Sequence, residues 1–158
     1  MAGTLLSLCM LFTGIPVISV RRINIGPENK MRDIQHLLEV ATYAALDAGK
    51  AVMDIYRSGD LETAKKTDAS PVTKADRQSH TIIVGHLEKT QLPVLSEEGS
   101  NLAFDKRKQW EYFWLVDPLD GTKEFITKND EFTINIGIVR GNLPAGGVIY
   151  VPCHDILY

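Results

Sequence analysis

The chain has 158 residues, of which 44% are hydrophobic and 23% are charged. This is the ordinary composition of a globular protein with a single hydrophobic core. The net charge of −3 argues against electrostatic binding to nucleic acid or to an anionic membrane. Cys9 and Cys153 are too few for a disulfide framework and have no partner cysteines at metal-ligand spacing. We therefore expect a reducing, cytoplasmic location.

Residues 1–30 precede the recognisable globular pattern. Residues 1–20 carry no charge and approach the length of a membrane span, about 20 residues, but polar side chains and Pro16 interrupt them. They also lack the basic start and small-residue cleavage site of a signal peptide. As a weak anchor, the segment would be followed by Arg21 and Arg22, which would keep the remainder on the cytoplasmic side of the inner membrane. We favour instead an upstream extension of a chain that starts at Met31, because globular patterning begins only there.

Two helices are expected after Met31. From Asp33 to Tyr56, apolar residues recur at three- and four-residue steps, which predicts a long amphipathic helix ending near Gly59. A second helix is expected at about 75–89, because Thr73 and Asp76 have the spacing of a capping box. In isolation, Asp76 is most simply interpreted as a helix-capping carboxylate.

Several strands are expected. Residues 113–116 are wholly apolar, which predicts a buried strand, and residues 132–138 alternate between apolar and polar, which predicts a half-buried one. A turn at 141–142 leads to an antiparallel return strand at 148–151. The remaining expectations are a weak strand within 61–69, a short strand at 93–95, a loop at 100–111 and a last strand beginning at Ile156.

The segment WLVDPLDGTKEF, residues 114–125, places two carboxylates at the end of the apolar strand. Pro118 has no N–H group, so we expect the chain to leave the sheet there. Asp120 is expected to cap a short helix that begins near Gly121. Acidic groups beside free helix amides suit a hard cation and a phosphate. Taken alone, however, this pattern is more simply a strand, a turn and a capping aspartate.

Other acidic segments change that interpretation. Asp76 lies at a helix start, Glu97 and Glu98 follow one strand, and Asp117 and Asp120 follow another. Clustered carboxylates repel one another, which raises their pKa values unless a cation neutralises them. No cysteine or histidine lies at a helpful spacing, so an all-oxygen ligand set favours Mg²⁺ or Mn²⁺ over zinc.

Three motifs resemble a known family. SPVTKAD at 70–76, SEEG at 96–99 and DPLDGT at 117–122 are similar, in order and approximate separation, to the N-terminal motifs of the inositol-monophosphatase-like phosphatases. Within that family, WLVDPLDGTKEFI followed by EFTINIGIV and VIYVP most closely resembles the 3′(2′),5′-bisphosphate nucleotidases of the CysQ type. Inositol monophosphatases more often have a DPIDGTTNF-like version. The resemblance covers about residues 31–158.

The resemblance implies an α+β fold, a layered helix and sheet sandwich, and a phosphomonoesterase that uses two or more Mg²⁺ ions, with Mn²⁺ as the alternative. Its partner would be a small-molecule phosphate monoester. The metal ligands implied by the matching motifs are Glu97, Asp117, the Leu119 carbonyl and Asp120. Glu98 is not expected to bind the metal directly.

The resemblance also implies roles in catalysis and substrate binding. Asp76 and Thr122 correspond to the pair that orients and activates the nucleophilic water, and the amides of Gly121 and Thr122 correspond to the phosphate seat. The complete substrate-binding set implied by the family is Glu97, Leu119, Asp120, Gly121 and Thr122.

One departure from the family bears on function. The family has a second domain with a Trp-Asp motif, whose aspartate is a further metal ligand, and these 158 residues contain no Trp-Asp pair. We therefore expect residues 31–158 to be an N-terminal metal-binding domain, the fold being truncated after it. The expected reaction is removal of the 3′-phosphate from adenosine 3′,5′-bisphosphate. Inositol monophosphatase activity is the alternative, and a catalytically silent, metal-binding fragment is an alternative of another class.

Overall fold

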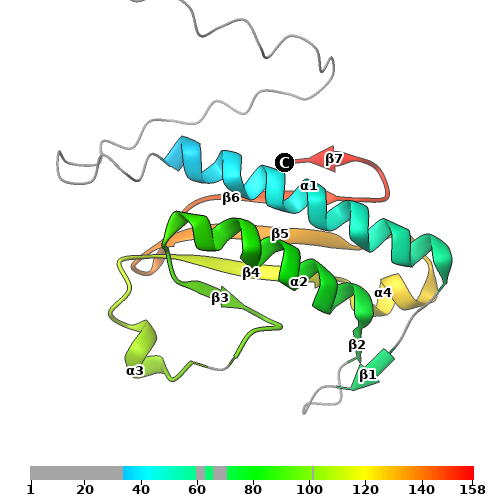
Figure 1. Cartoon of the computed structure of the whole chain (residues 1–158), viewed down its shortest axis with the longest axis horizontal. Coiled ribbons are helices and arrows are strands. Elements are labelled where there is room, and N and C mark those ends of the chain that lie inside the picture. Colours follow the sequence, from blue (N-terminus) through cyan, green and yellow to red (C-terminus); the bar gives the residue numbers. More distant parts are fainter. Residues whose placement is uncertain (1–33, 60–62, 66–70, 101) are drawn as a thin grey trace, which may run out of the picture.

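The computed structural model describes residues 34–59, 63–65, 71–100 and 102–158. In this part of the chain, two helices lie side by side on one face of a five-stranded sheet (Figure 1). The predicted extension at residues 1–30 lies outside the described residues. No helix among those described is long and apolar enough to cross a membrane.

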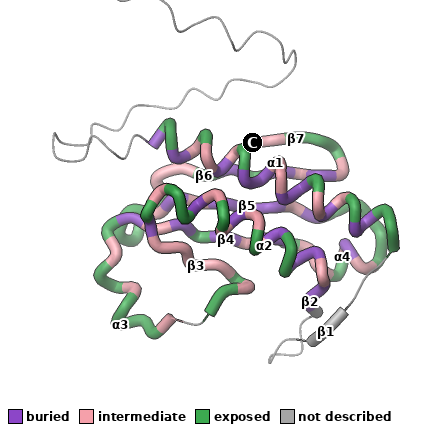
Figure 2. Tube along the Cα trace, in the orientation of Figure 1, coloured by how far each residue is buried: buried purple, intermediate pink, exposed green. Residues whose placement is uncertain are grey.

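The two long helices confirm the predicted periodicity. Helix α1 spans Ile34–Ser58, and α2 spans Lys74–Leu87 and continues into a 3₁₀ turn, η2, at Glu88–Thr90. The buried side of α1 is rich in alanine, which permits close packing, and Figure 2 shows this side turned toward the sheet. At Gly49 the approach is closest, because an added Cβ would lie 2.3 Å from Cε1 of Tyr150. Small residues on α1 therefore determine how near the helix lies to the sheet.

The main sheet has the order β3-β4-β5-β6-β7. Strand β3 runs parallel to β4, and all other neighbours are antiparallel. Helix α1 packs on β5 and β6, and α2 packs on β4. The bounds of the strands are β3 Val94–Ser96, β4 Tyr112–Asp120, β5 Thr133–Arg140, β6 Leu143–Val151 and β7 Ile156–Leu157. A separate small sheet pairs β1, Thr63–Lys65, with β2, Pro71–Thr73.

The sheet has one covered and one open face. Trp114 and other buried residues of β4 point toward the helices, whereas Leu115, on the opposite face, is 49% exposed. Ile149 on β6 shares the open face and is 47% exposed. Among the described residues, the core therefore lies between the helices and the covered face.

Two expectations about local structure are wrong. Residues 100–111 are not only a loop, because they contain a short helix, α3, at Phe104–Arg107. The chain also does not leave the sheet at Pro118, because β4 continues to Asp120 through a β-bulge. Asp117 pairs with Asn135 and Asp120 pairs with Thr133, so the two residues between the aspartates face one residue of β5. A bulge tolerates proline because the extra residue needs no ladder hydrogen bond.

Candidate metal and phosphate site

The bulge in β4 positions the segment from Asp117 to Asp120. Helix α2 contacts this segment from the covered face of the sheet, where the fully buried Ser79 hydroxyl donates to the Pro118 carbonyl at 2.7 Å. Within the bulge, the Leu119 amide donates to Oδ1 of Asp117 at 3.2 Å. The backbone between the two aspartates is thus held both by a neighbouring helix and by one of the aspartates.

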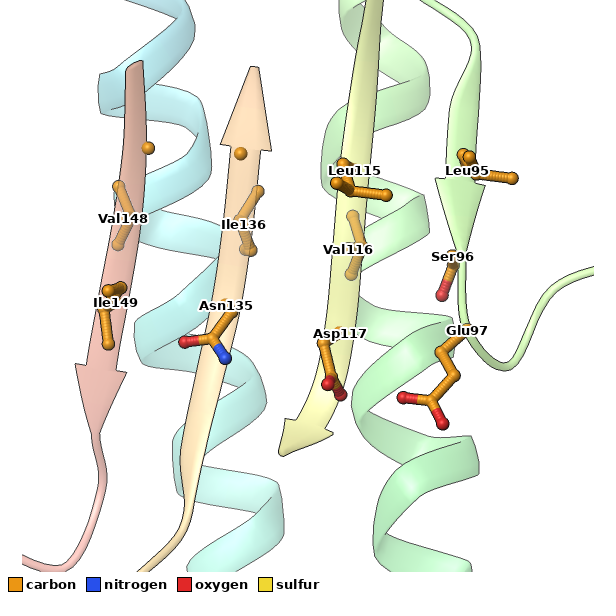
Figure 3. A pocket seen from close by; sticks show the side chains of 12 residues that line it. Leu95, Ser96, Glu97, Leu115, Val116, Asp117, Asn135, Ile136, Val148 and Ile149 are labelled. Atoms are coloured by element: carbon orange, nitrogen blue, oxygen red, sulfur yellow. The ribbon is translucent and has the colours of Figure 1, made fainter. Parts of the chain in front are cut away.

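Glu97 and Asp117 come together because β3 and β4 are parallel and end at the same edge. The Glu97 amide continues the pairing by donating to the Val116 carbonyl at 3.0 Å. Figure 3 shows the Glu97 and Asp117 carboxylates side by side at this end of the sheet. Burial, then the nearby charges of Glu97 and Asp120, raise the pKa of Asp117 to about 7. Such a cluster favours either a shared proton or a bound cation.

The Asp120 side chain makes its hydrogen bond across the sheet. Its carboxylate accepts a hydrogen bond from Nδ2 of Asn135 on β5 at 3.0 Å. Helix α4 spans Thr122–Thr127, and its N-cap is Gly121, with no side-chain capping bond. The prediction that Asp120 caps this helix is therefore wrong, because its side chain bonds across the sheet instead.

The carboxylate oxygens of this site are suitable ligands for a hard cation such as Mg²⁺. Glu97 follows β3, Asp117 and Asp120 lie on β4, and the charges of Glu97 and Asp120 help to raise the pKa of Asp117. Among the described residues, however, no three His, Cys, Asp or Glu side chains are arranged closely enough to bind one metal ion together. Strand pairing brings Glu97, Asp117 and Asp120 close enough to repel one another, and the Asp120 carboxylate accepts a hydrogen bond from Asn135.

The side chains of Asp76 and Thr122 are hydrogen-bonded although the two residues are 46 positions apart in the chain. The Thr122 hydroxyl lies 3.1 Å from Oδ1 of Asp76 and 3.3 Å from the Leu119 carbonyl oxygen. Asp76 is only 2% exposed, and its other oxygen accepts from the Thr73 amide at 2.7 Å and from the Thr73 hydroxyl at 2.5 Å. The predicted capping box is confirmed. One buried carboxylate therefore both caps α2 and holds Thr122.

Gly121 links the acidic motif to α4 in a conformation that suits glycine. Its φ is +97°, and an added Cβ would lie 2.7 Å from the Glu131 carbonyl oxygen. This left-handed residue brings Thr122 back toward Asp76 directly after the strand ends. The position of Thr122 thus depends on the absence of a side chain at residue 121.

A groove extends from the acidic residues along the open face of the sheet. It has a volume of about 710 Å³. Leu95, Leu115 and Ile149 are apolar residues of its lining, and Glu97, Asp117 and Asn135 lie toward one end (Figure 3). In the described part of the chain, the groove therefore combines a mainly apolar lining with acidic side chains at one end.

Comparison with known protein families identifies the family of this chain. Residues 33–158 match the sequence pattern of the inositol monophosphatase family. The chain belongs to the inositol monophosphatase family. The family fold, an α+β sandwich of helices on a mixed sheet, is thereby confirmed for the part of the chain that matches.

Several members of the inositol monophosphatase family are similar to this chain. The 3′(2′),5′-bisphosphate nucleotidase CysQ of Salmonella typhimurium is 45% identical over 125 residues, which are 77% of this chain and 50% of that protein. The CysQ structure from Bacteroides thetaiotaomicron is 48% identical with a TM-score of 0.69, covering 78% of this chain and 45% of that one. The suhB structure from Bartonella henselae is 30% identical, also with a TM-score of 0.69, over 77% and 47%. This chain spans about half the length of the curated relatives that it matches.

Several polar residues of the site were not predicted from the sequence. Asn135 occupies a polar position of the alternating strand, and that alternation places it on the same face as Asp117. Ser79 follows Asp76 by three residues, which puts both on the inner side of α2. His80 contacts the Ser96 hydroxyl through Nδ1 at 2.8 Å, directly before Glu97. Helix and strand periodicity could have indicated the first two, but the third required the packing of α2 beside β3.

Proposed function

We propose that this chain is the metal-binding part of a Mg²⁺-dependent phosphomonoesterase that removes the 3′-phosphate of adenosine 3′,5′-bisphosphate. The observation that carries the proposal is the bond between Thr122 and the buried Asp76, which the Leu119 backbone links to Asp117 of the carboxylate cluster. The choice of substrate is supported by relatives named as 3′(2′),5′-bisphosphate nucleotidases.

The metal would be held by oxygen ligands. We assign Glu97, Asp117, the Leu119 carbonyl and Asp120 to two or more Mg²⁺ ions, with Mn²⁺ as the alternative. When bound, these ions would supply Lewis-acid polarisation and a nearby water of lowered pKa. The carboxylate cluster supports the assignment, because its mutual repulsion is relieved by added positive charge.

Thr122 and Asp76 would prepare the nucleophilic water. The Thr122 hydroxyl has one proton, and donating it to Asp76 leaves the threonine oxygen as an acceptor for a water proton. Asp76 is fixed by its two bonds from Thr73, so the orientation of Thr122 is set before a substrate arrives. We assign the amides of Gly121 and Thr122 to the substrate phosphate, as the family resemblance implies.

Phosphate release from adenosine 3′,5′-bisphosphate and from inositol 1-phosphate is the test of this proposal. With purified protein and Mg²⁺, we expect faster release from the nucleotide. Faster release from the inositol phosphate would favour the alternative, an inositol monophosphatase. Mg²⁺ binding without turnover of either substrate would identify the 158-residue chain as a catalytically silent, metal-binding fragment. A chain that neither binds Mg²⁺ nor releases phosphate would contradict the proposal.

The roles of Thr122 and Asp120 can be separated by mutation. Thr122→Ala should lower kcat by about 100-fold or more, because a positioned proton acceptor is lost, while Mg²⁺ affinity changes little. Asp120→Asn should weaken Mg²⁺ binding by on the order of 10- to 100-fold, since a neutral amide is a poorer ligand for a hard cation. Calorimetric Mg²⁺ titration and phosphate-release kinetics measure the two effects. Equal losses of Mg²⁺ affinity in both variants would show that the roles are assigned wrongly.

A further inference from the structure

Asn135 makes a short chain of side-chain hydrogen bonds beside the acidic residues. Its Nδ2 donates to Oδ2 of Asp120 at 3.0 Å, and its Oδ1 accepts from the Thr133 hydroxyl at 3.2 Å. Because the threonine can donate to the amide oxygen, the amide nitrogen is left to face Asp120. Asn135 is also the register partner of Asp117, and Figure 3 shows it on the strand next to that of Asp117.

A neutral donor at this place has a specific electrostatic consequence. A lysine or arginine beside Asp120 would orient its carboxylate but would also neutralise it and repel an incoming cation. An amide restrains one oxygen and leaves the full negative charge. Asn135 therefore fixes the orientation of Asp120 while preserving the charge that attracts a divalent cation.

We propose that Asn135 is a positioning residue that holds the Asp120 carboxylate, through its bond to Oδ2, in an orientation that suits metal binding. This inference rests on the proposed function, because it takes Asp120 as a metal ligand. Groups that orient metal ligands typically contribute about 10- to 100-fold to metal affinity. Asn135 lies on a strand of the main sheet, and a rigid strand is suited to this role.

Magnesium affinity of the full chain is the direct test, and it requires no turnover. Asn135→Ala should weaken Mg²⁺ binding, measured by calorimetry, by about 10-fold or more. Asn142→Ala, in the exposed turn between β5 and β6, is the matched control and should leave Mg²⁺ affinity unchanged.

A double-mutant cycle tests whether Asn135 acts through Asp120. In the Asp120→Asn background, Asn135→Ala should cause little further loss of Mg²⁺ affinity, because the carboxylate it orients is already gone. Thr133→Val should give a smaller loss in the same direction, since it frees the amide without removing it. This variant also provides the test if Asn135→Ala does not fold, as judged by thermal unfolding in EDTA.

The outcomes separate this inference from the proposed function. Unchanged or tighter Mg²⁺ binding by Asn135→Ala would overturn it, as would full additivity with Asp120→Asn. If the wild-type chain binds Mg²⁺ and Asn135→Ala weakens that binding, the inference holds even where neither phosphate ester is hydrolysed. A wild-type chain that binds no Mg²⁺ would overturn both.

Discussion

Replacing Asp117 by asparagine should stabilise the metal-free protein above pH 7 and remove its stabilisation by Mg²⁺. The Asp117 carboxylate is partly buried and lies near the charges of Glu97 and Asp120, which together raise its pKa to about 7. An acid whose pKa is raised by folding binds its proton more tightly in the folded state. This contribution to stability is complete below pH 4 and is lost as the pH rises through about 7.

The size of the Asp117 effect follows from that shift after a discount for solvent. Because Asp117 is only partly buried, screening reduces the gain in the free energy of unfolding to on the order of 1 kcal/mol. The gain should be complete above pH 7, shrink as the pH falls and vanish below about pH 4, where the wild-type carboxyl becomes protonated in the unfolded state as well. Removing the carboxylate also removes a proposed ligand, so added Mg²⁺ should no longer raise the unfolding temperature.

Thermal unfolding of wild type and Asp117→Asn at pH 4 and pH 8, with EDTA or Mg²⁺, measures both effects. Asp54→Asn, at an exposed position of α1, is the matched control and should change neither the pH dependence nor the response to Mg²⁺. If Asp117→Asn destabilises the metal-free protein at pH 8, the three carboxylates do not repel one another as described.

Gly121→Ala should have the largest effect on stability among the variants considered. Its φ of +97° disfavours any side chain, and the new Cβ would lie 2.7 Å from the Glu131 carbonyl oxygen and 3.2 Å from Cα of Phe132. Both neighbours are backbone atoms, so no side chain can rotate away. We expect a loss of about 2–4 kcal/mol, combining the left-handed backbone with the steric overlap.

Gly141→Ala is the matched control for Gly121→Ala. Gly141 also has a positive φ, of +60°, but an added Cβ meets no atom within 4 Å. Its loss should be limited to the backbone cost of about 1–2 kcal/mol. Chemical denaturation of both variants in EDTA provides the comparison. Equal losses would show that the contact with Glu131 and Phe132 does not constrain residue 121.

Local sequence patterns determined much of the fold. Apolar residues recur at every turn of α1 and at every second residue of β5. Each element is therefore indicated by several residues of its own segment. The capping box of Thr73 and Asp76 is equally local, since its atoms lie within one helical turn. The three motifs that carry the family resemblance are likewise short, and the family match confirms what they indicated.

Only the tertiary structure decided the partners of the site residues. Parallel pairing of β3 with β4 places Glu97 beside Asp117, and the packing of α2 places Asp76 beside Thr122. Asp120 has the residue type and position of a helix cap, yet it bonds to Asn135 because the bulge in β4 directs it toward β5. These partners lie 15 to 46 residues apart in the chain. Local periodicity carries no information on such contacts, because they depend on the register of strands and the packing of the core.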